Sequence, residues 1–222
     1  MSNPEFFNII ALYNLTLWPI TLLTILLGLV AIFFVFKKNV YSDRLIVLIL
    51  VFIWFWVGIM FGFVFYGPWT PLVFGFPFPG FGYFYAVIFT LQGIIFLYFG
   101  VYRKALSFKF ETNIFAIVGS ILILYAIAFY WLVGFATGYP YPFYPIFGTA
   151  PCPVVIFTIG LFLWADKRIS PIVLILPTVY GLMAFIPVFA FGIYADIVLF
   201  IAGFISLYLL YNHWKSKTDI ES

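Results

Sequence analysis

The stretch Gly138-Tyr-Pro-Tyr-Pro-Phe-Tyr-Pro-Ile-Phe-Gly-Thr-Ala-Pro-Cys-Pro-Val-Val-Ile-Phe-Thr-Ile-Gly-Leu-Phe-Leu-Trp164 decides the fold of this chain. Prolines recur through its first half and remove backbone donors, so that half is not expected to be helical. Residues 154–165 are apolar and predict a helix of about 18 Å, against about 30 Å of membrane hydrocarbon. Cys152 is therefore expected inside the membrane on irregular backbone, which must be buried in protein or line a wet cavity. We expect the rest of the chain to surround this segment.

The composition places the chain in a membrane. Hydrophobic residues make up 66% of the 222 residues and charged residues 8%, whereas a soluble domain carries about a quarter charged residues. A sizeable soluble domain is therefore excluded. The net charge of +3 does not indicate a nucleic-acid partner, because the basic residues lie where membrane topology requires them. The single cysteine excludes an internal disulfide and a thiolate-only metal site within one chain.

Apolar runs separated by short polar or Pro/Gly-rich segments predict an all-α polytopic bundle. The chain, residues 1–222, forms one integral membrane domain with about seven transmembrane helices, the fifth of them short. The predicted spans are residues 9–36, 45–65, 81–102, 113–135, 154–165, 169–186 and 194–211.

The distribution of basic residues predicts the orientation of these spans. All ten Lys and Arg residues fall in four places, which are residues 37–44, 103–109, 167–168 and 215–217. These places are alternate loops and the C-terminal segment, so they share one side of the membrane. By the positive-inside rule that side is the cytoplasm, which puts the N-terminus outside and the C-terminus inside.

Two stretches of the sequence echo each other. Residues 18–25 align with residues 152–159, and both open a span that runs from outside to inside. One interpretation is a parallel repeat that relates spans one to three with spans five to seven, as in some transporters. The other is that apolar helices match each other by chance, and the sequence leaves both open.

Several motifs resemble those of a known family. They are residues 12–14 with 17–19, the pair Gln92-Gly93 with Leu97, and the block from Phe147 to Gly160 that contains Pro-Cys-Pro. Together they resemble an uncharacterised prokaryotic membrane family catalogued as domain of unknown function 6064. The resemblance implies a small multi-pass protein of the cell (plasma) membrane, and it brings no established activity.

Cys152 is the first candidate for a binding residue. Pro151 and Pro153 fix its backbone and, with Thr149, would present the thiol to a solute. The alternative is that Cys152 is a small buried hydrophobic residue, which is the usual role of a free cysteine.

A soft metal ion is the one cofactor that the sequence suggests. Met60, Met183 and Cys152 are expected at a similar depth near the outer ends of their spans. A thiolate with thioethers suits a monovalent copper-like ion. The alternative is that the methionines fill gaps between helices.

Three polar residues fall within or at the ends of spans. Gln92, the only glutamine, is expected to face the bundle and join two helices, with Trp54 or Trp56 as its partner, although it is also a candidate for solute binding. Asn14 and Asp196 are candidates in the outer half. We favour Asp196 as an interfacial cap of the last helix over a role in ion or proton coupling.

The sequence contains no His-Glu-x-x-His, Gly-x-Ser-x-Gly or phosphate-loop motif, so no enzyme is predicted. The favoured function is transport or binding of a small, uncharged or weakly charged solute. Its outward vestibule would be formed by residues 66–80, residues 138–153 and the outer ends of the first and last spans. The alternative is an accessory subunit of a larger membrane complex or a homo-oligomer, with the aromatic outer loops as a docking surface in the lipid bilayer.

Overall fold

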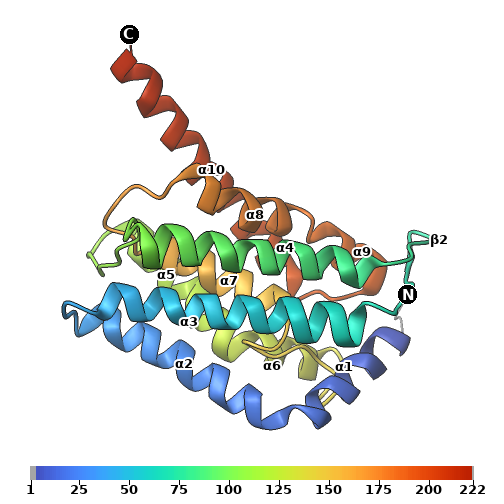
Figure 1. Ribbon diagram of the computed structural model, residues 1–222. Helices are drawn as coiled ribbons and strands as arrows, with labels where there is room; N and C mark the ends of the chain where they lie inside the picture. The colour runs from blue at the N-terminus through green and yellow to red at the C-terminus, as the bar shows by residue number, and fades with distance from the viewer. Residues whose placement is uncertain (1–3, 222) are drawn as a thin grey trace.

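The computed structural model describes the backbone of residues 4–221 and the side chains of residues 5–213. The described part of the chain forms a helical bundle with a short β-hairpin, whose two strands have two residues each (Figure 1). The elements are α1 (Pro4–Thr16), α2 (Trp18–Phe36), α3 (Ser42–Trp56), the π-helical η1 (Val57–Tyr66), β1 (Leu72–Val73), β2 (Phe76–Pro77), α4 (Phe81–Phe96), the π-helical η2 (Leu97–Tyr102), α5 (Ile114–Leu124), the π-helical η3 (Tyr125–Phe129), α6 (Tyr130–Ala136), α7 (Pro151–Phe162), α8 (Pro171–Leu182), α9 (Phe185–Phe191) and α10 (Asp196–Glu221).

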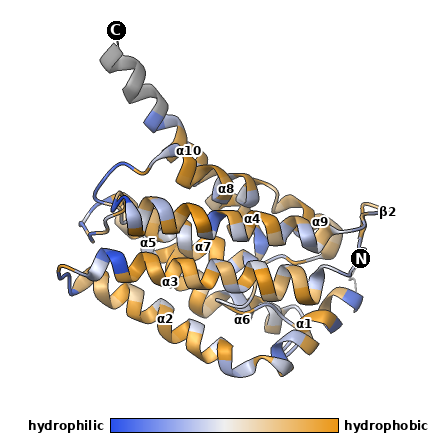
Figure 2. Cartoon of the chain, in the orientation of Figure 1, coloured by the Kyte–Doolittle hydropathy of each residue, from blue (hydrophilic) through white to orange (hydrophobic). Residues whose placement is uncertain are grey.

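The predicted helical membrane bundle is confirmed. Six helical segments within the described part of the chain are long and apolar enough to cross a membrane, and Figure 2 shows the hydropathy of their residues. They are Trp18–Phe36, Ser42–Tyr66, Phe81–Tyr102, Ile114–Ala136, Pro171–Phe191 and Asp196–His213. The remaining predicted span corresponds to α7, which has 12 residues.

Helix α7 lies at the centre of the bundle. All 12 of its residues are buried, and it contacts α3, α5, α8 and α10. The chain therefore surrounds α7, as the sequence predicts. At about 1.5 Å per residue, α7 is shorter than the membrane hydrocarbon is thick.

The prediction of irregular backbone at Cys152 is wrong, because α7 begins at Pro151, three residues earlier than expected. Ala150 is the extended N-cap residue, with φ −112° and ψ 150°. The amides of a first helical turn have no acceptor within the helix, so Pro151 and Pro153 remove no helical hydrogen bond there. Cys152 consequently lies in the first turn of α7.

Two other predicted boundaries need correction. The run 9–36 is not one helix, because the chain breaks at Leu17 between α1 and α2. Pro19 lies in the first turn of α2 and has no N–H to bond the carbonyl of Leu15, so the hydrogen-bond ladder of α1 does not continue into α2. The sixth span extends beyond the predicted end at residue 186, because Pro187 lies in the first turn of α9 and so does not terminate it.

Glycines allow the long helices to touch. A Cβ atom on Gly62 of η1 would lie 2.6 Å from the Cα atom of Ala86 on α4. A Cβ atom on Gly203 of α10 would lie 2.6 Å from the carbonyl carbon of Gly181 on α8. Small residues at such crossings let helix backbones approach closely in a membrane, where dispersion contacts hold helices together.

The basic segments that the structure describes gather at one end of the bundle, which we call the basic end (residues 37–44, 103–109 and 167–168). Figure 1 shows the α2–α3 turn, the segment between η2 and α5, and the α7–α8 connection at this end, with β2 and the start of α1 at the other. Lys38 Nζ lies 3.4 Å from Asp43 and 3.3 Å from Asp166, which ties the α2–α3 turn to the α7–α8 connection. Lys215 and Lys217, the fourth predicted cluster, lie outside the residues whose side chains are described.

The shared end of the basic segments predicts the orientation of the protein in the membrane. Reporter fusions after Lys38, Lys104 and Arg168 should read cytoplasmic, because Lys and Arg are retained on that side. Fusions within residues 66–80 and 138–150 should read external. A cytoplasmic signal from either aromatic loop would contradict this orientation.

Candidate binding site

A buried carboxyl group marks the candidate site. Asp196 opens α10 and its side chain is 0% exposed. The hydroxyl of Tyr130, at the start of α6, donates a hydrogen bond of 2.6 Å to Asp196 Oδ1. The expected role of Asp196 as an interfacial helix cap is therefore wrong, because its carboxyl group points into the bundle and accepts from another helix.

The only cysteine lies beside this carboxyl group. Cys152 is buried next to Asp196, and its Sγ atom shares a hydrogen bond of 3.5 Å with the hydroxyl of Tyr180 on α8. The second carboxyl oxygen, Asp196 Oδ2, has no hydrogen-bond partner among the described residues. Asp196, Tyr130, Cys152 and Tyr180 form what we call the core polar cluster.

A small cavity adjoins the core polar cluster. Its volume is about 30 Å³, which is enough for one water molecule. Its lining includes Tyr66, Tyr85, Pro151, Cys152, Tyr180 and Ile193. Tyr66 and Pro151 belong to the two loop segments that were predicted to form an outward vestibule, and Ile193 lies before the last helix. These segments do meet here, but they surround a small cavity and not an open vestibule.

Two predicted site residues hold the proline-rich loop. Asn14 Nδ2 on α1 donates to the carbonyl oxygens of Pro142 at 2.7 Å and Tyr144 at 2.9 Å. The hydroxyl of Thr149 donates to the carbonyl of Ile146 at 3.2 Å. Neither side chain lines the cavity beside Cys152, so the structure gives both a role in fixing the loop.

Gln92 is buried between α4 and α8. Its Nε2 atom donates to the carbonyl oxygen of Val173 at 3.1 Å. This carbonyl is the one that Pro177, four residues later in α8, leaves without a helical donor because proline has no N–H. Gln92 therefore supplies from a neighbouring helix the hydrogen bond that Pro177 removes.

The predicted pairing of Gln92 with Trp54 or Trp56 is wrong. Trp54 Nε1 donates to Thr158 Oγ1 at 3.0 Å, and Trp56 Nε1 donates to the hydroxyl of Tyr13 at 2.9 Å. An indole only donates hydrogen bonds, and hydroxyl groups on neighbouring helices supply its acceptors.

The three sulfur-containing candidates for metal binding do not line one cavity. Cys152 lines the cavity of the core polar cluster, whereas Met60 lines a separate hollow with Phe52 and Trp56. Met183 follows the end of α8 and lines neither of these hollows. Within the described residues there is no group of three or more His, Cys, Asp or Glu side chains that would hold a metal ion.

The sequence did not single out Tyr130 and Tyr180. They are two of 16 tyrosines, and each meets its partner only through the packing of different helices. The signal that would have found them is the buried acid itself, since an uncompensated carboxyl group in a bundle needs hydroxyl or amide donors nearby.

These features define a polytopic helical membrane protein with polar side chains buried in its core. The chain belongs to the family described as "Family of unknown function (DUF6064)", whose model matches residues 3–219. This confirms the resemblance found in the sequence. No curated protein and no solved structure matches the chain.

The pairing of Gln92 with the Val173 carbonyl predicts a specific coupling with Pro177. Gln92→Leu should lower the free energy of unfolding by about 0.6–2 kcal/mol, because a buried carbonyl loses its donor. In a Pro177→Ala background the same substitution should cost close to nothing, since the alanine backbone would supply the helical N–H. Thermal unfolding of the four proteins in one detergent measures this double-mutant cycle, and an equal cost in both backgrounds would refute the pairing.

Proposed function

We propose that this protein binds a small, uncharged or weakly charged solute at the core polar cluster and transports it across the plasma membrane of a prokaryotic cell. The observation that carries the proposal is the fully buried Asp196 carboxyl group, whose Oδ2 atom lacks a partner among the described residues. Polar groups at such positions are costly and usually serve function.

The chemistry of the cluster favours a solute that donates hydrogen bonds. The eight Lys and Arg residues whose side chains are described all belong to the basic end, so none is available to neutralise Asp196. A carboxyl oxygen accepts, and the thiol and the tyrosine hydroxyls both donate and accept. A neutral solute with hydroxyl or amino groups would form matched hydrogen bonds with these groups.

The small volume of the cavity corresponds, in this proposal, to a closed state of a transport cycle. Opening requires movement of the helices that carry Cys152 and Tyr180. Helix α8 contains Pro177 and is separated from α9 by a turn at Met183–Ala184, and interruptions of this kind are where helices bend. Movement at α8 would change the Cys152–Tyr180 contact directly.

A transport cycle predicts that water reaches Cys152 from outside. In native membranes a membrane-impermeant, charged thiol reagent added externally should label Cys152 slowly, because only a hydrated thiol ionises and reacts. Cys152 is the only cysteine, so mass spectrometry of the intact protein measures the labelled fraction without ambiguity.

Two cysteines introduced into a Cys152→Ser background control this experiment. Phe76→Cys on the exposed β-hairpin should label rapidly, and Ile156→Cys, deeper in α7 and fully buried, should stay unlabelled until the protein is unfolded. If Cys152 behaves like Ile156→Cys, the solute-binding proposal fails.

A second candidate function is that of an accessory subunit. It rests on the hairpin between η1 and α4, where Phe74, Phe76 and Phe78 are exposed and Phe76 reaches 76%. Aromatic side chains grouped on a surface loop are typical of protein interfaces. The lipid-facing helices would then anchor the hairpin for a partner outside the membrane.

The subunit function predicts that Phe76 is needed for assembly. After extraction in a mild detergent, Phe76→Ser should reduce the size of the native particle, because it removes an apolar contact from the interface. Tyr102→Ser is the matched control, since Tyr102 is equally exposed at 76% but lies at the basic end. A wild-type particle of monomer size would rule out both a stable complex and a homo-oligomer under these conditions.

A further inference from the structure

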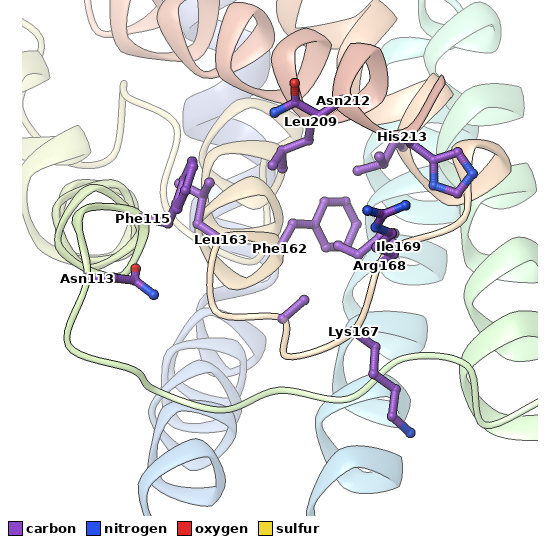
Figure 3. Close-up of a pocket in the computed structure, with 12 residues that line it drawn as sticks. Asn113, Phe115, Phe162, Leu163, Lys167, Arg168, Ile169, Leu209, Asn212 and His213 are labelled. Carbon is purple, nitrogen blue, oxygen red and sulfur yellow. The ribbon is translucent and has the colours of Figure 1, made fainter. Parts of the chain in front are cut away.

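A second hollow lies at the basic end of the bundle. The core polar cluster lies toward the opposite end, at the start of α7. The volume of this second hollow is about 250 Å³. Figure 3 shows its lining residues at the start of α5, the end of α7, the connection to α8 and residues 209–213 of α10. We call it the basic pocket, lined by Asn113, Phe115, Phe162, Leu163, Ala165, Lys167, Arg168, Ile169, Leu174, Leu209, Asn212 and His213.

The polar lining of the basic pocket favours an anion. Lys167 and Arg168 bring two positive charges, and Asn113, Asn212 and His213 bring groups that can donate hydrogen bonds. None of the described lining residues is acidic. The neighbouring Asp166 is engaged elsewhere, because its Oδ2 atom accepts hydrogen bonds from Lys38 and Ser107.

The start of α5 adds to this preference. Asn113 is the N-cap residue, and its Oδ1 atom accepts from the backbone N–H of Ala116 at 2.9 Å. The amino terminus of a helix carries a partial positive charge that favours anions nearby. Helix α5 has 11 residues, so the partial positive charge at its amino terminus adds to the positive potential of Lys167 and Arg168.

The apolar lining indicates where the anion comes from. Phe115, Phe162 and Leu209 lie on helices of the membrane bundle and give the pocket an apolar part of its lining. Phe115 stacks on Tyr208 of α10 with ring centroids 6.4 Å apart, and both rings are exposed. An apolar surface thus continues from the pocket along α5 and α10, where an acyl chain would lie.

We infer that the basic pocket binds a phosphate group, carried by an anionic membrane lipid whose acyl chains lie against α5 and α10. Basic pockets between transmembrane helices on the cytoplasmic side bind lipid head groups of this type. Arg168 and Lys167 supply the positive charge that attracts the phosphate group to this end of the bundle. This site uses no residue of the core polar cluster, so it stands apart from the proposed transport function.

The test is a lipid titration of the purified full-length protein in a non-ionic detergent. Phosphatidylglycerol should raise the unfolding temperature with saturation, because a ligand of the folded state stabilises it. Phosphatidylcholine, which has a phosphate but no net charge, should have little effect. Inorganic phosphate separates the two sources of the anion: a shift equal to that of the lipid at matched concentration would overturn the lipid as the ligand and leave a site for the free anion.

Matched variants localise the effect. Lys167→Gln/Arg168→Gln should weaken the apparent affinity for phosphatidylglycerol roughly tenfold or more, as expected when two charges near the membrane surface are lost. Arg103→Gln/Lys109→Gln removes one arginine and one lysine from the same end but outside the pocket. The affinity of this variant for phosphatidylglycerol should stay within about twofold of the wild-type affinity, because exposed charges at that distance are screened.

The unfolding temperature of each variant without lipid shows whether it is folded. Lys167 is exposed, so Lys167→Gln alone serves as a second variant that removes one charge with little effect on packing. Equal weakening by both double variants would overturn the proposal, because it would reflect general attraction to the basic end. An absence of any preference for phosphatidylglycerol over phosphatidylcholine would overturn it as well.

Discussion

The fold depends on supplying hydrogen bonds to backbone carbonyls that prolines leave without donors. In a bilayer no water replaces a missing N–H, so the protein must provide one. Gln92 does so for the Val173 carbonyl opposite Pro177. Asn14 does so for two carbonyls of the proline-rich loop, at Pro142 and Tyr144. Each of these bonds joins segments far apart in the chain, so the freed carbonyls add specific contacts to the packing between helices.

This constraint also explains why the shortest helix lies in the centre. A helix of 12 residues cannot cross the hydrocarbon alone, so the loop that precedes it lies where it needs protein around it. Helices α1 and α2 meet that need, since Asn14 binds the loop and Thr24 donates to the Phe147 carbonyl at 3.3 Å. The break at Leu17 separates these two helices and lets both contact the loop.

The sequence was sufficient for the features that hydropathy and charge determine. The helical bundle, the central burial of the short helix and the gathering of residues 37–44, 103–109 and 167–168 at one end all follow from them. The same properties said nothing about partners between helices. The indole of Trp54, a predicted partner of Gln92, donates to Thr158 instead. The Gln92 amide donates to the Val173 carbonyl, which Pro177 leaves without a helical donor. The sequence indicates how deep a residue lies along its helix, but not how that helix is rotated about its own axis. This rotation decides which side chains meet.

The start of α7 was misplaced for a related reason. Proline-rich sequence usually excludes a helix, yet the first turn tolerates proline because its amides lack acceptors within the helix. Pro151 and Pro153 both fall in that turn. The composition of the segment alone therefore could not distinguish irregular backbone at Cys152 from the beginning of a helix. That distinction matters for the candidate site, because a helical Cys152 has a fixed orientation toward Tyr180.

Helix α7 also connects the two proposed sites. Its first turn carries Cys152 of the core polar cluster, and Phe162 at its other end lines the basic pocket, followed by Leu163. The close packing around α7 favours displacement of the helix as a unit over gradual deformation, if the helix moves. A displacement that enlarges the cavity at Cys152 would therefore also move the apolar wall of the basic pocket. If a solute at one end and a lipid at the other prefer different positions of α7, each changes the affinity of the protein for the other by the same factor.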